Sequence, residues 1–289
     1  MKDNVLKMTE GNPVRLLVVF AIPMMIGNIF QQVYNIADSI IVGQFLGSQA
    51  LAAIGATSSL TFFFFALCNG FGAGGGIIVS QSFGRGDTSQ VKNCIANTGY
   101  IMIALPFLVG SLAFGIAPVL LKLLKTPEDI FHDALVYIRL MSIGLFFVSI
   151  YNYVSSMMRA LGDSKTPLYF LIFSCILNIG LDILFVFVLK MGVFGAGLAT
   201  TIAQIVSAIY AFSFYAGKKS TLNIKISLYP EYSIVKRILS IGLSSGLVIF
   251  GFGFFPLMMN KTLFISDLDG TLLDCSASVS AETADMINE

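Results

Sequence analysis

The fold of this chain is decided by residues 13–47, which read PVRLLVVFAIPMMIGNIFQQVYNIADSIIVGQFLG. From Val14 to Phe45 the only Asp, Glu, Lys, Arg or His side chains are Arg15, at the edge, and Asp38. At about 1.5 Å per residue a helix over this stretch would run to roughly 48 Å, longer than the ~30 Å hydrocarbon core of a bilayer. The stretch therefore predicts a membrane-spanning helix, and its lone carboxylate is a candidate functional group.

The composition of the whole chain supports a polytopic membrane protein. Of the 289 residues, 56% are hydrophobic and only 11% are charged, too few to cover the surface of a water-soluble domain. Apolar stretches of membrane length cover 14–45, 50–79, 93–121, 131–158, 168–189 and 192–216, and a seventh covers 238–258. We therefore predict an all-α bundle of six spans plus a seventh. The net charge of +1 gives no indication of nucleic-acid binding.

The orientation of the bundle follows from the positions of the basic residues. When the links between spans are assigned alternately to two sides, the side that holds the N-terminus carries most of the 17 Lys and Arg residues. Cytoplasmic loops carry an excess of Lys and Arg. The pattern predicts a multi-pass protein of the cell membrane with a cytoplasmic N-terminus.

A second intramembrane acid, Asp182, lies in the fifth span within the run Asn178-Ile179-Gly180-Leu181-Asp182. The i, i+4 spacing places Asn178 and Asp182 on one face of a helix. The first and fifth spans both run outward from the cytoplasm, so we expect Asp38 and Asp182 to lie at similar depth in the outer half of the membrane. Tyr34 lies one turn before Asp38 on the same face.

These side chains predict a polar pocket inside the bundle. Asn152 in the fourth span and Thr200, Thr201 and Gln204 in the sixth could complete it. Desolvation penalises an ionised carboxyl group, which makes proton uptake and release feasible, and the same oxygens suit Na⁺. The alternative is that both acids only hydrogen-bond within the bundle or pair with Arg139.

Several motifs resemble the first half of a multidrug and toxic compound extrusion (MATE) transporter, over about residues 10–258. The matching residues are Pro23, Tyr34-Asn35-Ile36-Ala37-Asp38, Val42-Gly43, Gln81, Gly84, Arg159-Ala160-Leu161-Gly162-Asp163, Pro167, Asn178, Asp182, Gly195-Ala196-Gly197 and Thr200. The resemblance implies an antiporter, not an enzyme, that exports organic, often cationic, compounds in exchange for H⁺ or Na⁺. No other cofactor is expected.

The resemblance also assigns a cation-coupling site to the N-terminal lobe. Its residues would be Asp38, Tyr34, Asn152, Asn178, Asp182 and Thr200, with Na⁺, where it is the coupling ion, held at Asp38, Asn178 and Asp182. The family has two six-helix lobes with the substrate path between them. This chain has one lobe plus a seventh span, so its partners would be the bilayer, small organic cations, and either a C-terminal lobe or a second copy of itself.

The chain changes character after residue 258. Residues 259–273 read MNKTLFISDLDGTLL and resemble the opening strand and loop of haloacid dehalogenase phosphatases. In that family the residue matching Asp267 is the nucleophile and the one matching Asp269 is the general acid/base, with Mg²⁺ bridging the oxygens. Residues 259–289 are too few to fold alone. We therefore divide the chain into a transporter lobe, 1–258, and a truncated α/β fragment, 259–289.

Four alternatives to ion-coupled drug export remain open at this stage. The chain could be a non-functional product of two joined reading frames, a flippase for lipid-linked precursors, a half-transporter that acts as a homodimer, or a membrane-tethered phosphatase. A flippase would use a basic cavity, whereas this lobe offers mainly acids and Arg139. A phosphatase would need the later Lys and acidic residues that the short tail lacks.

Overall fold

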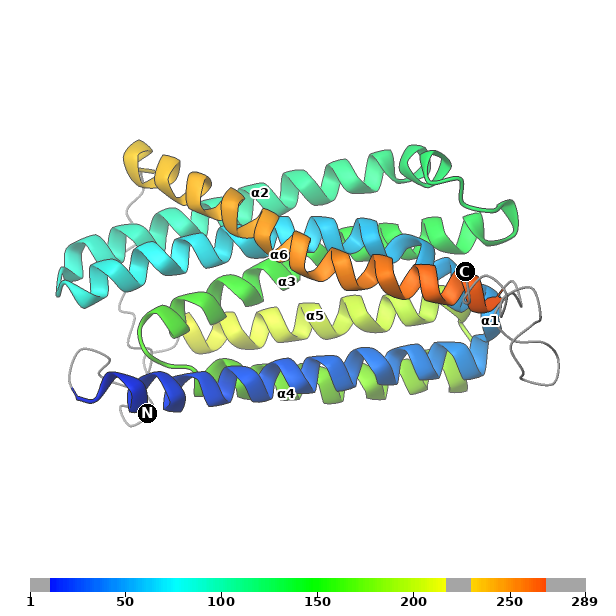
Figure 1. The fold of residues 1–289 in the computed structure, drawn as a ribbon, viewed down its shortest axis with the longest axis horizontal. Coiled ribbons are helices and arrows are strands. Elements are labelled where there is room, and N and C mark those ends of the chain that lie inside the picture. The colour runs from blue at the N-terminus through cyan, green and yellow to red at the C-terminus, as the bar shows by residue number, and fades with distance from the viewer. Residues whose placement is uncertain (1–10, 217–229, 269–289) are drawn as a thin grey trace, which may run out of the picture.

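The structure is a computed structural model that describes residues 11–216 and 230–268, with side chains described in these ranges except at 215–216 and 252–268. Every element in the described ranges is helical. In chain order they are α1 (Pro13–Gly84), α2 (Thr88–Leu123), α3 (Glu128–Ala160), α4 (Lys165–Asp182), the π-helix η2 (Ile183–Val188), α5 (Gly192–Ala216) and α6 (Tyr232–Leu268). Among the described residues, six helices are long and apolar enough to cross a membrane. The predicted all-α membrane bundle is confirmed (Figure 1).

Helix α1 supplies the first two predicted spans because it folds back at Gly47. The backbone there has φ 85° and ψ −177°, a conformation that only glycine adopts without strain. The first arm (residues 13–46) and the second arm (residues 48–84) run antiparallel (Figure 1). The arms touch beside the bend, where Leu51 lies against Gly43. Pro23 lies within the first arm, as predicted, and removes one backbone hydrogen bond there.

The helix starts at the end of the bundle that holds Asn12 are set by short polar caps. The Asn12 side chain accepts from Val14 N at 3.0 Å before α1. Asp87 accepts from Gln90 N at 3.0 Å before α2. Asp163 accepts from Thr166 N at 3.0 Å before α4. These side chains satisfy amide groups that the first turn of a helix leaves free.

The second arm of α1 contains the glycine segment, residues 70–76, on which three other helices pack. Each glycine faces a neighbour that a side chain would displace. Gly72 lies under Met102 of α2, Gly75 lies against Thr98 of α2, and Gly76 lies against Ser156 of α3. The Ser156 hydroxyl donates to the Gly72 carbonyl at 2.8 Å. Close backbone approach between membrane helices requires such small residues.

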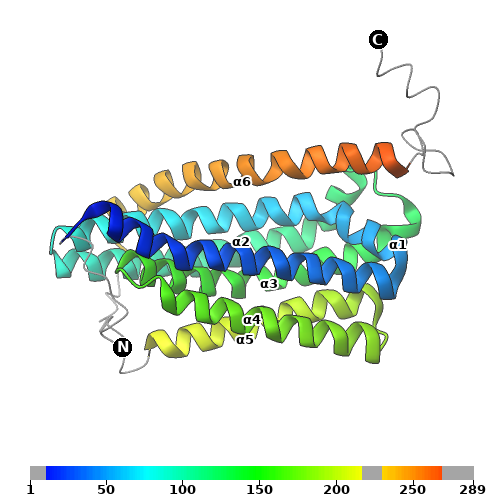
Figure 2. The same cartoon turned by 60° about the horizontal axis from the view of Figure 1, so that its bottom comes forward.

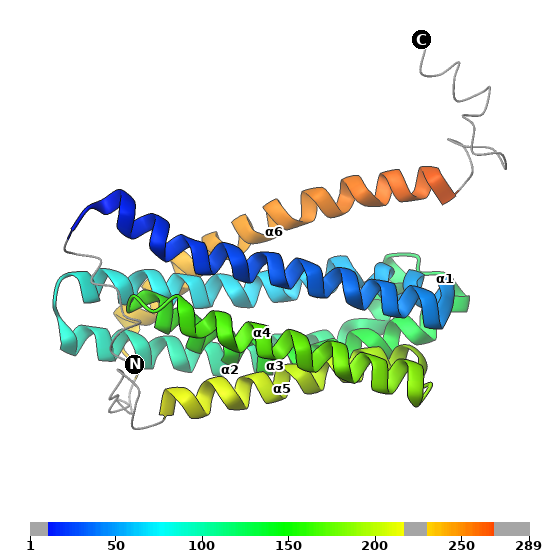
Figure 3. The same ribbon diagram turned by 90° about the horizontal axis from the view of Figure 1, so that it is seen from below.

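Helix α6 packs along the same segment through glycines of its own. A methyl group on Gly74 would lie 2.7 Å from the Gly242 nitrogen, and one on Gly70 would lie 2.6 Å from the Gly242 carbonyl oxygen and closer still to Gly246. Two glycine pairs, each four residues apart, therefore meet backbone to backbone in an antiparallel contact, the glycine seam. Figures 2 and 3 show α6 along one side of the bundle. The C-terminal end of α6 diverges from the first arm of α1.

Side chains hold the N-terminal end of α6 to the lobe. Arg237 Nη2 donates to Gln81 Oε1 at 2.9 Å, and Glu231 N donates to Asn97 Oδ1 at 2.8 Å. Ile234 and Ile238 are buried in the largest apolar cluster, formed with α1, α2 and α3. These contacts explain why α6 begins at Tyr232, inside the stretch predicted as a polar link.

The expected strand after residue 258 is absent from the described part of the tail. Helix α6 instead continues through Leu268. A helix satisfies its backbone groups internally, whereas a lone strand has no partner for its amides and carbonyls. The side chain of Asp267 and all of Asp269 lie outside the described residues.

The glycine seam gives a stability prediction with a matched control on the same arm. Gly74→Ala would force the α6 backbone away, so we expect it to lower the free energy of unfolding by about 1–3 kcal/mol. Gly55→Ala meets nothing within 4 Å and should be neutral or stabilising, since alanine favours a helix by up to ~1 kcal/mol. Thermal unfolding in detergent, followed by circular dichroism, measures both. Equal effects of the two variants would contradict the seam.

Candidate functional site

The predicted polar site lies near the end of the bundle at which α1 bends. The first arm, α3, α4 with η2, and α5 converge there. The residues close to the bend form an apolar cluster that shields this part of the bundle: Ile41, Val42, Ala50, Tyr137, Met141, Val186, Val193 and Ala196. Asp38 lies about 13 Å along the helix axis from Gly47. The site therefore lies toward the end of the bundle at which α1 bends, and the apolar cluster lies between the site and that bend.

Asp38 and Asp182, far apart in the sequence, face each other across α1 and α4. Their carboxyl groups are close enough to share a hydrogen bond. Asp182 is fully buried, and Asp38 is half-buried. Both Asp182 oxygens and Asp38 Oδ1 are buried without any hydrogen-bond donor. Two carboxyl groups so placed need a proton or a cation between them, because two bare negative charges at this distance repel.

Asn178, Thr200 and Tyr34 surround the carboxyl pair. Asn178 Nδ2 donates to Thr200 Oγ1 at 3.4 Å, and Thr200 Oγ1 donates to the Ala196 carbonyl at 3.2 Å. Tyr34 interacts with the Thr200 hydroxyl and lies close to both aspartates. Asn178 Oδ1 is a further buried acceptor without a donor. The site thus brings together five of the six predicted residues.

The backbone after Asp182 has a wider helical turn than the rest of α4. Residues Ile183–Val188 form the π-helix η2, and Asp182 is the residue at which α4 gives way to it. π-helical turns are rare and are frequent at functional sites. The sequence carries no marker for this turn, and it was not predicted.

Tyr137 of α3 is a site residue that the sequence analysis missed. It is 9% exposed and lies close enough to Asp38, Tyr34 and Asp182 for electrostatic interaction with each of them. A tyrosine in an apolar run is ordinarily a packing residue, so its spacing alone gives no reason to select it. The signal that could have found it is its depth, which matches that of Asp38 and Asp182.

The hydrogen bond of Asn152 goes to another residue and not to the carboxyl pair. Its amide donates to Asn69 Oδ1 on the second arm of α1, next to the glycine segment. The two other polar residues proposed from α5 also face α3. Thr201 Oγ1 hydrogen-bonds to the Leu140 carbonyl at 3.2 Å, and Gln204 lies against Gly144. Their contacts therefore join α5 to α3.

The alternative pairing of the aspartates with Arg139 finds no support in the structure. The Arg139 guanidinium lies 5.1 Å from the ring centroid of Phe114 on α2.

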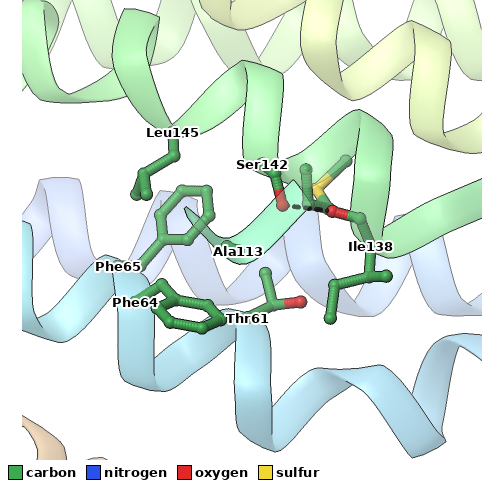
Figure 4. A pocket seen from close by; sticks show the side chains of 8 residues that line it. Thr61, Phe64, Phe65, Ala113, Ile138, Ser142 and Leu145 are labelled. Carbon is green, nitrogen blue, oxygen red and sulfur yellow. Dashed lines mark hydrogen bonds between the residues drawn. The ribbon is translucent and has the colours of Figure 1, made fainter. Parts of the chain in front are cut away.

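A small apolar gap where α1, α2 and α3 meet is lined by Thr61, Phe64, Phe65, Ala113, Ile138, Met141, Ser142 and Leu145 (Figure 4). The residues lining this gap include none of the predicted site residues.

The oxygens of the site set its chemistry. Asp38, Asp182, Asn178 and Thr200 offer carboxylate, amide and hydroxyl oxygens, which suit a proton or a hard cation such as Na⁺. Among the described residues, no group of three or more His, Cys, Asp or Glu side chains is placed to hold a metal ion.

A family model described as MatE matches residues 23–184, which include Tyr34, Asp38, Asn178 and Asp182. The chain belongs to the MatE family. The members of this family are transporters and not enzymes, so the predicted membership of a transporter family and the prediction that the chain is not an enzyme are confirmed.

Individual MatE relatives are bacterial multidrug proteins. The probable multidrug resistance protein YpnP of Bacillus subtilis (strain 168) is 34% identical over 239 residues, which cover 83% of this chain and 54% of the relative. The multidrug export protein MepA of Staphylococcus aureus (strain MRSA252) is 27% identical over 265 residues, covering 91% of this chain and 59% of the relative. This MatE chain spans about half the length of the curated relatives that it matches.

The fold is also that of solved MatE transporters. The outward-facing conformation of a multidrug resistance MATE family transporter of the MOP superfamily superposes with a TM-score of 0.81 at 26% identity. The superposition covers 89% of this chain and 58% of the other. The prediction that the chain folds as one lobe of such a transporter is confirmed.

The Thr200 hydroxyl can be tested for its structural part in the site. Thr200→Val removes the acceptor of the buried Asn178 amide, so we expect it to lower the free energy of unfolding by about 1–3 kcal/mol. Thr200→Ser keeps the hydroxyl and should cost less. The measurement is thermal unfolding in detergent. A valine variant as stable as the serine variant would show that the hydrogen bond from Asn178 contributes nothing.

Proposed function

We propose that this chain is the N-terminal lobe of an ion-coupled exporter of organic cations, and that Asp38 and Asp182 are its coupling-ion site. The observation that carries the proposal is the facing pair of carboxyl groups with three unpartnered buried oxygens. The multidrug names of the relatives support the class of substrate. Exchange for H⁺ or Na⁺ is the coupling that these oxygens favour.

The proposed coupling acts through the first arm of α1. Binding of a proton or Na⁺ removes the repulsion between Asp38 and Asp182, which draws the first arm toward α4. Release of the ion restores the repulsion and favours separation of the two helices. Pro23 lies on the same arm and leaves a backbone carbonyl without its amide partner, so the arm can bend there at low cost.

The proposal also requires a second lobe and a defined orientation of the chain in the membrane. The substrate path would lie between this lobe and either a C-terminal lobe or a second copy of the chain, as in transporters built from structural repeats. Large apolar side chains on the first arm, among them Leu17, Met25 and Ile29, are exposed in the described residues and would meet lipid or that lobe. The excess of Lys and Arg on one side supports a cytoplasmic N-terminus.

The proposed role of Asp38 predicts a loss of transport. In cells that express the 289-residue chain, Asp38→Asn should reduce efflux of a fluorescent cationic dye to the level of cells without the chain, because asparagine cannot release a proton and binds Na⁺ more weakly. Asp133→Asn, at an exposed position of α3, is the matched control and should leave efflux unchanged. Equal efflux from the Asp38→Asn variant and the parent chain would refute ion coupling at Asp38.

The coupling ion can be identified from the thermal stability of the purified chain, without a transport assay. A ligand that binds only the folded state stabilises it in proportion to RT ln(1 + [L]/Kd). If Na⁺ is the coupling ion, NaCl should raise the melting temperature of the purified chain above that in choline chloride at equal ionic strength. Asp182→Asn should abolish the difference. No difference between the salts in the parent chain would favour H⁺.

We also propose that residues 259–289 derive from the start of a haloacid dehalogenase phosphatase. The support is the run Asp267-Leu268-Asp269-Gly270-Thr271. Sequencing the locus and detecting a single expressed protein of 31.2 kDa would establish whether the two parts occur in one natural chain.

A further inference from the structure

Arg139 is an unexplained charge within a membrane-spanning helix. Between Ala134 and Met158 of α3 it is the only Lys, Arg, His, Asp or Glu side chain. Its position is about 16 Å along the axis from Glu128, where α3 begins, which is inside the apolar span. Charged side chains at such depth are costly and are normally paired or functional.

Within residues 11–214 and 230–251, Arg139 has an aromatic neighbour but no acidic side chain paired with it. Its guanidinium lies 5.1 Å from the centroid of the Phe114 ring, in cation–π range. Its Nε is buried and has no hydrogen-bond acceptor. Helix α2, on which Phe114 lies, contains no Asp or Glu from Thr88 to Leu123. The nearest acid along α3, Asp133, is about 9 Å away along the axis.

The faces of α3 show which way Arg139 points. Tyr137 and Leu140 pack against Gly197 of α5, and the Ser142 carbonyl backs onto Gly110 of α2. Ile138 packs in an apolar cluster with α1. Arg139 lies on the side of α3 that α5 and α1 leave uncovered, next to the side that contacts α2.

Residues on that uncovered side are exposed. Ile143, one turn after Arg139, is 46% exposed, and His132, two turns before it, is also exposed. On the α2 wall, Phe107 and Leu108 are 66% and 64% exposed. Large apolar side chains so exposed are suited to contact with lipid acyl chains. Arg139 therefore lies beside an exposed apolar surface formed by α2 and α3.

The bilayer can supply the missing anion. A phospholipid phosphate is negatively charged and offers oxygens that match the forked donors of a guanidinium. Long basic side chains extend toward the headgroups, and the bilayer thins locally around them. Around the α2–α3 loop, Glu128, Asp129 and Asp133 accompany Lys122 and Lys125. Even the last of these acids, Asp133, is about 9 Å along the α3 axis from Arg139.

We propose that Arg139 binds the phosphate of an anionic phospholipid that lies along the exposed sides of α2 and α3, in the leaflet beside the α2–α3 loop. The Phe114 ring holds the guanidinium in place, and the acyl chains lie along the exposed apolar side chains of α2. The site is independent of the proposed ion coupling, because it lies on another face of the lobe and needs no transport.

Native mass spectrometry of the purified chain with added phosphatidylglycerol tests the proposal. Arg139→Gln should weaken binding of the lipid by about tenfold, as expected for loss of a charge-assisted hydrogen bond. Arg139→Lys keeps the charge without the forked donors and should weaken it less. Arg85→Gln is the matched control, since Arg85 hydrogen-bonds Gln90 and Ser82 at the far end of α1. Unchanged binding to the Arg139→Gln variant would overturn the proposal.

Two further measurements distinguish a lipid phosphate from a soluble phosphate and control for misfolding. Glycerol 3-phosphate has the headgroup chemistry without acyl chains and should not displace the lipid. Effective displacement would show that the ligand is a soluble phosphate and would overturn lipid binding. Phe114→Leu leaves the arginine in place and should weaken lipid binding without loss of helical circular dichroism. Equal binding of phosphatidylglycerol to this variant would overturn the role of the ring.

Discussion

The backbone contact of the glycine segment of α1 with its neighbours is the constraint on which the rest of the structure depends. Gly70 and Gly74 meet α6, Gly72 and Gly75 meet α2, and Gly76 meets α3. A side chain at Gly70 or Gly74 would collide with the α6 backbone, and one at Gly75 or Gly76 would displace Thr98 or Ser156. The second arm is thereby fixed as the axis of the lobe, and polar groups beside it, such as Asn69 with Asn152, join the same helices.

The first arm of α1 has the opposite character, and the candidate site depends on the difference. It carries large exposed apolar side chains and a proline, and it is attached to the fixed second arm through the Gly47 bend. Asp38 belongs to this looser arm, whereas Asp182 belongs to α4 and is fully buried. A charge placed between the two therefore acts between a helix that can bend and one that is held by the bundle.

Those parts of the site that interrupt an apolar pattern could be predicted from the sequence. Asp38 and Asp182 stand out because acids are rare in apolar spans, and Asn178 follows from its spacing to Asp182. Tyr137 could not be found this way, because a tyrosine is compatible with an apolar helix. The π-turn after Asp182 and the pairing of Gly242 and Gly246 with the glycine segment depend on tertiary contacts, which a single sequence does not encode in any local pattern. The hydrogen bond of Asn152 to Asn69 could not be predicted either, because it depends on how α3 packs on the second arm.

The glycine seam also has a consequence for the synthesis and membrane insertion of the protein. Its two halves are separated by most of the chain, so at a synthesis rate of about 5–20 residues per second the second arm waits on the order of ten seconds for α6. During this interval the polar backbone around Gly70 and Gly74 faces lipid uncovered, because glycine has no side chain to shield it. A ribosome that pauses before α6 would therefore leave in the membrane an intermediate that quality-control proteases or insertion chaperones can recognise.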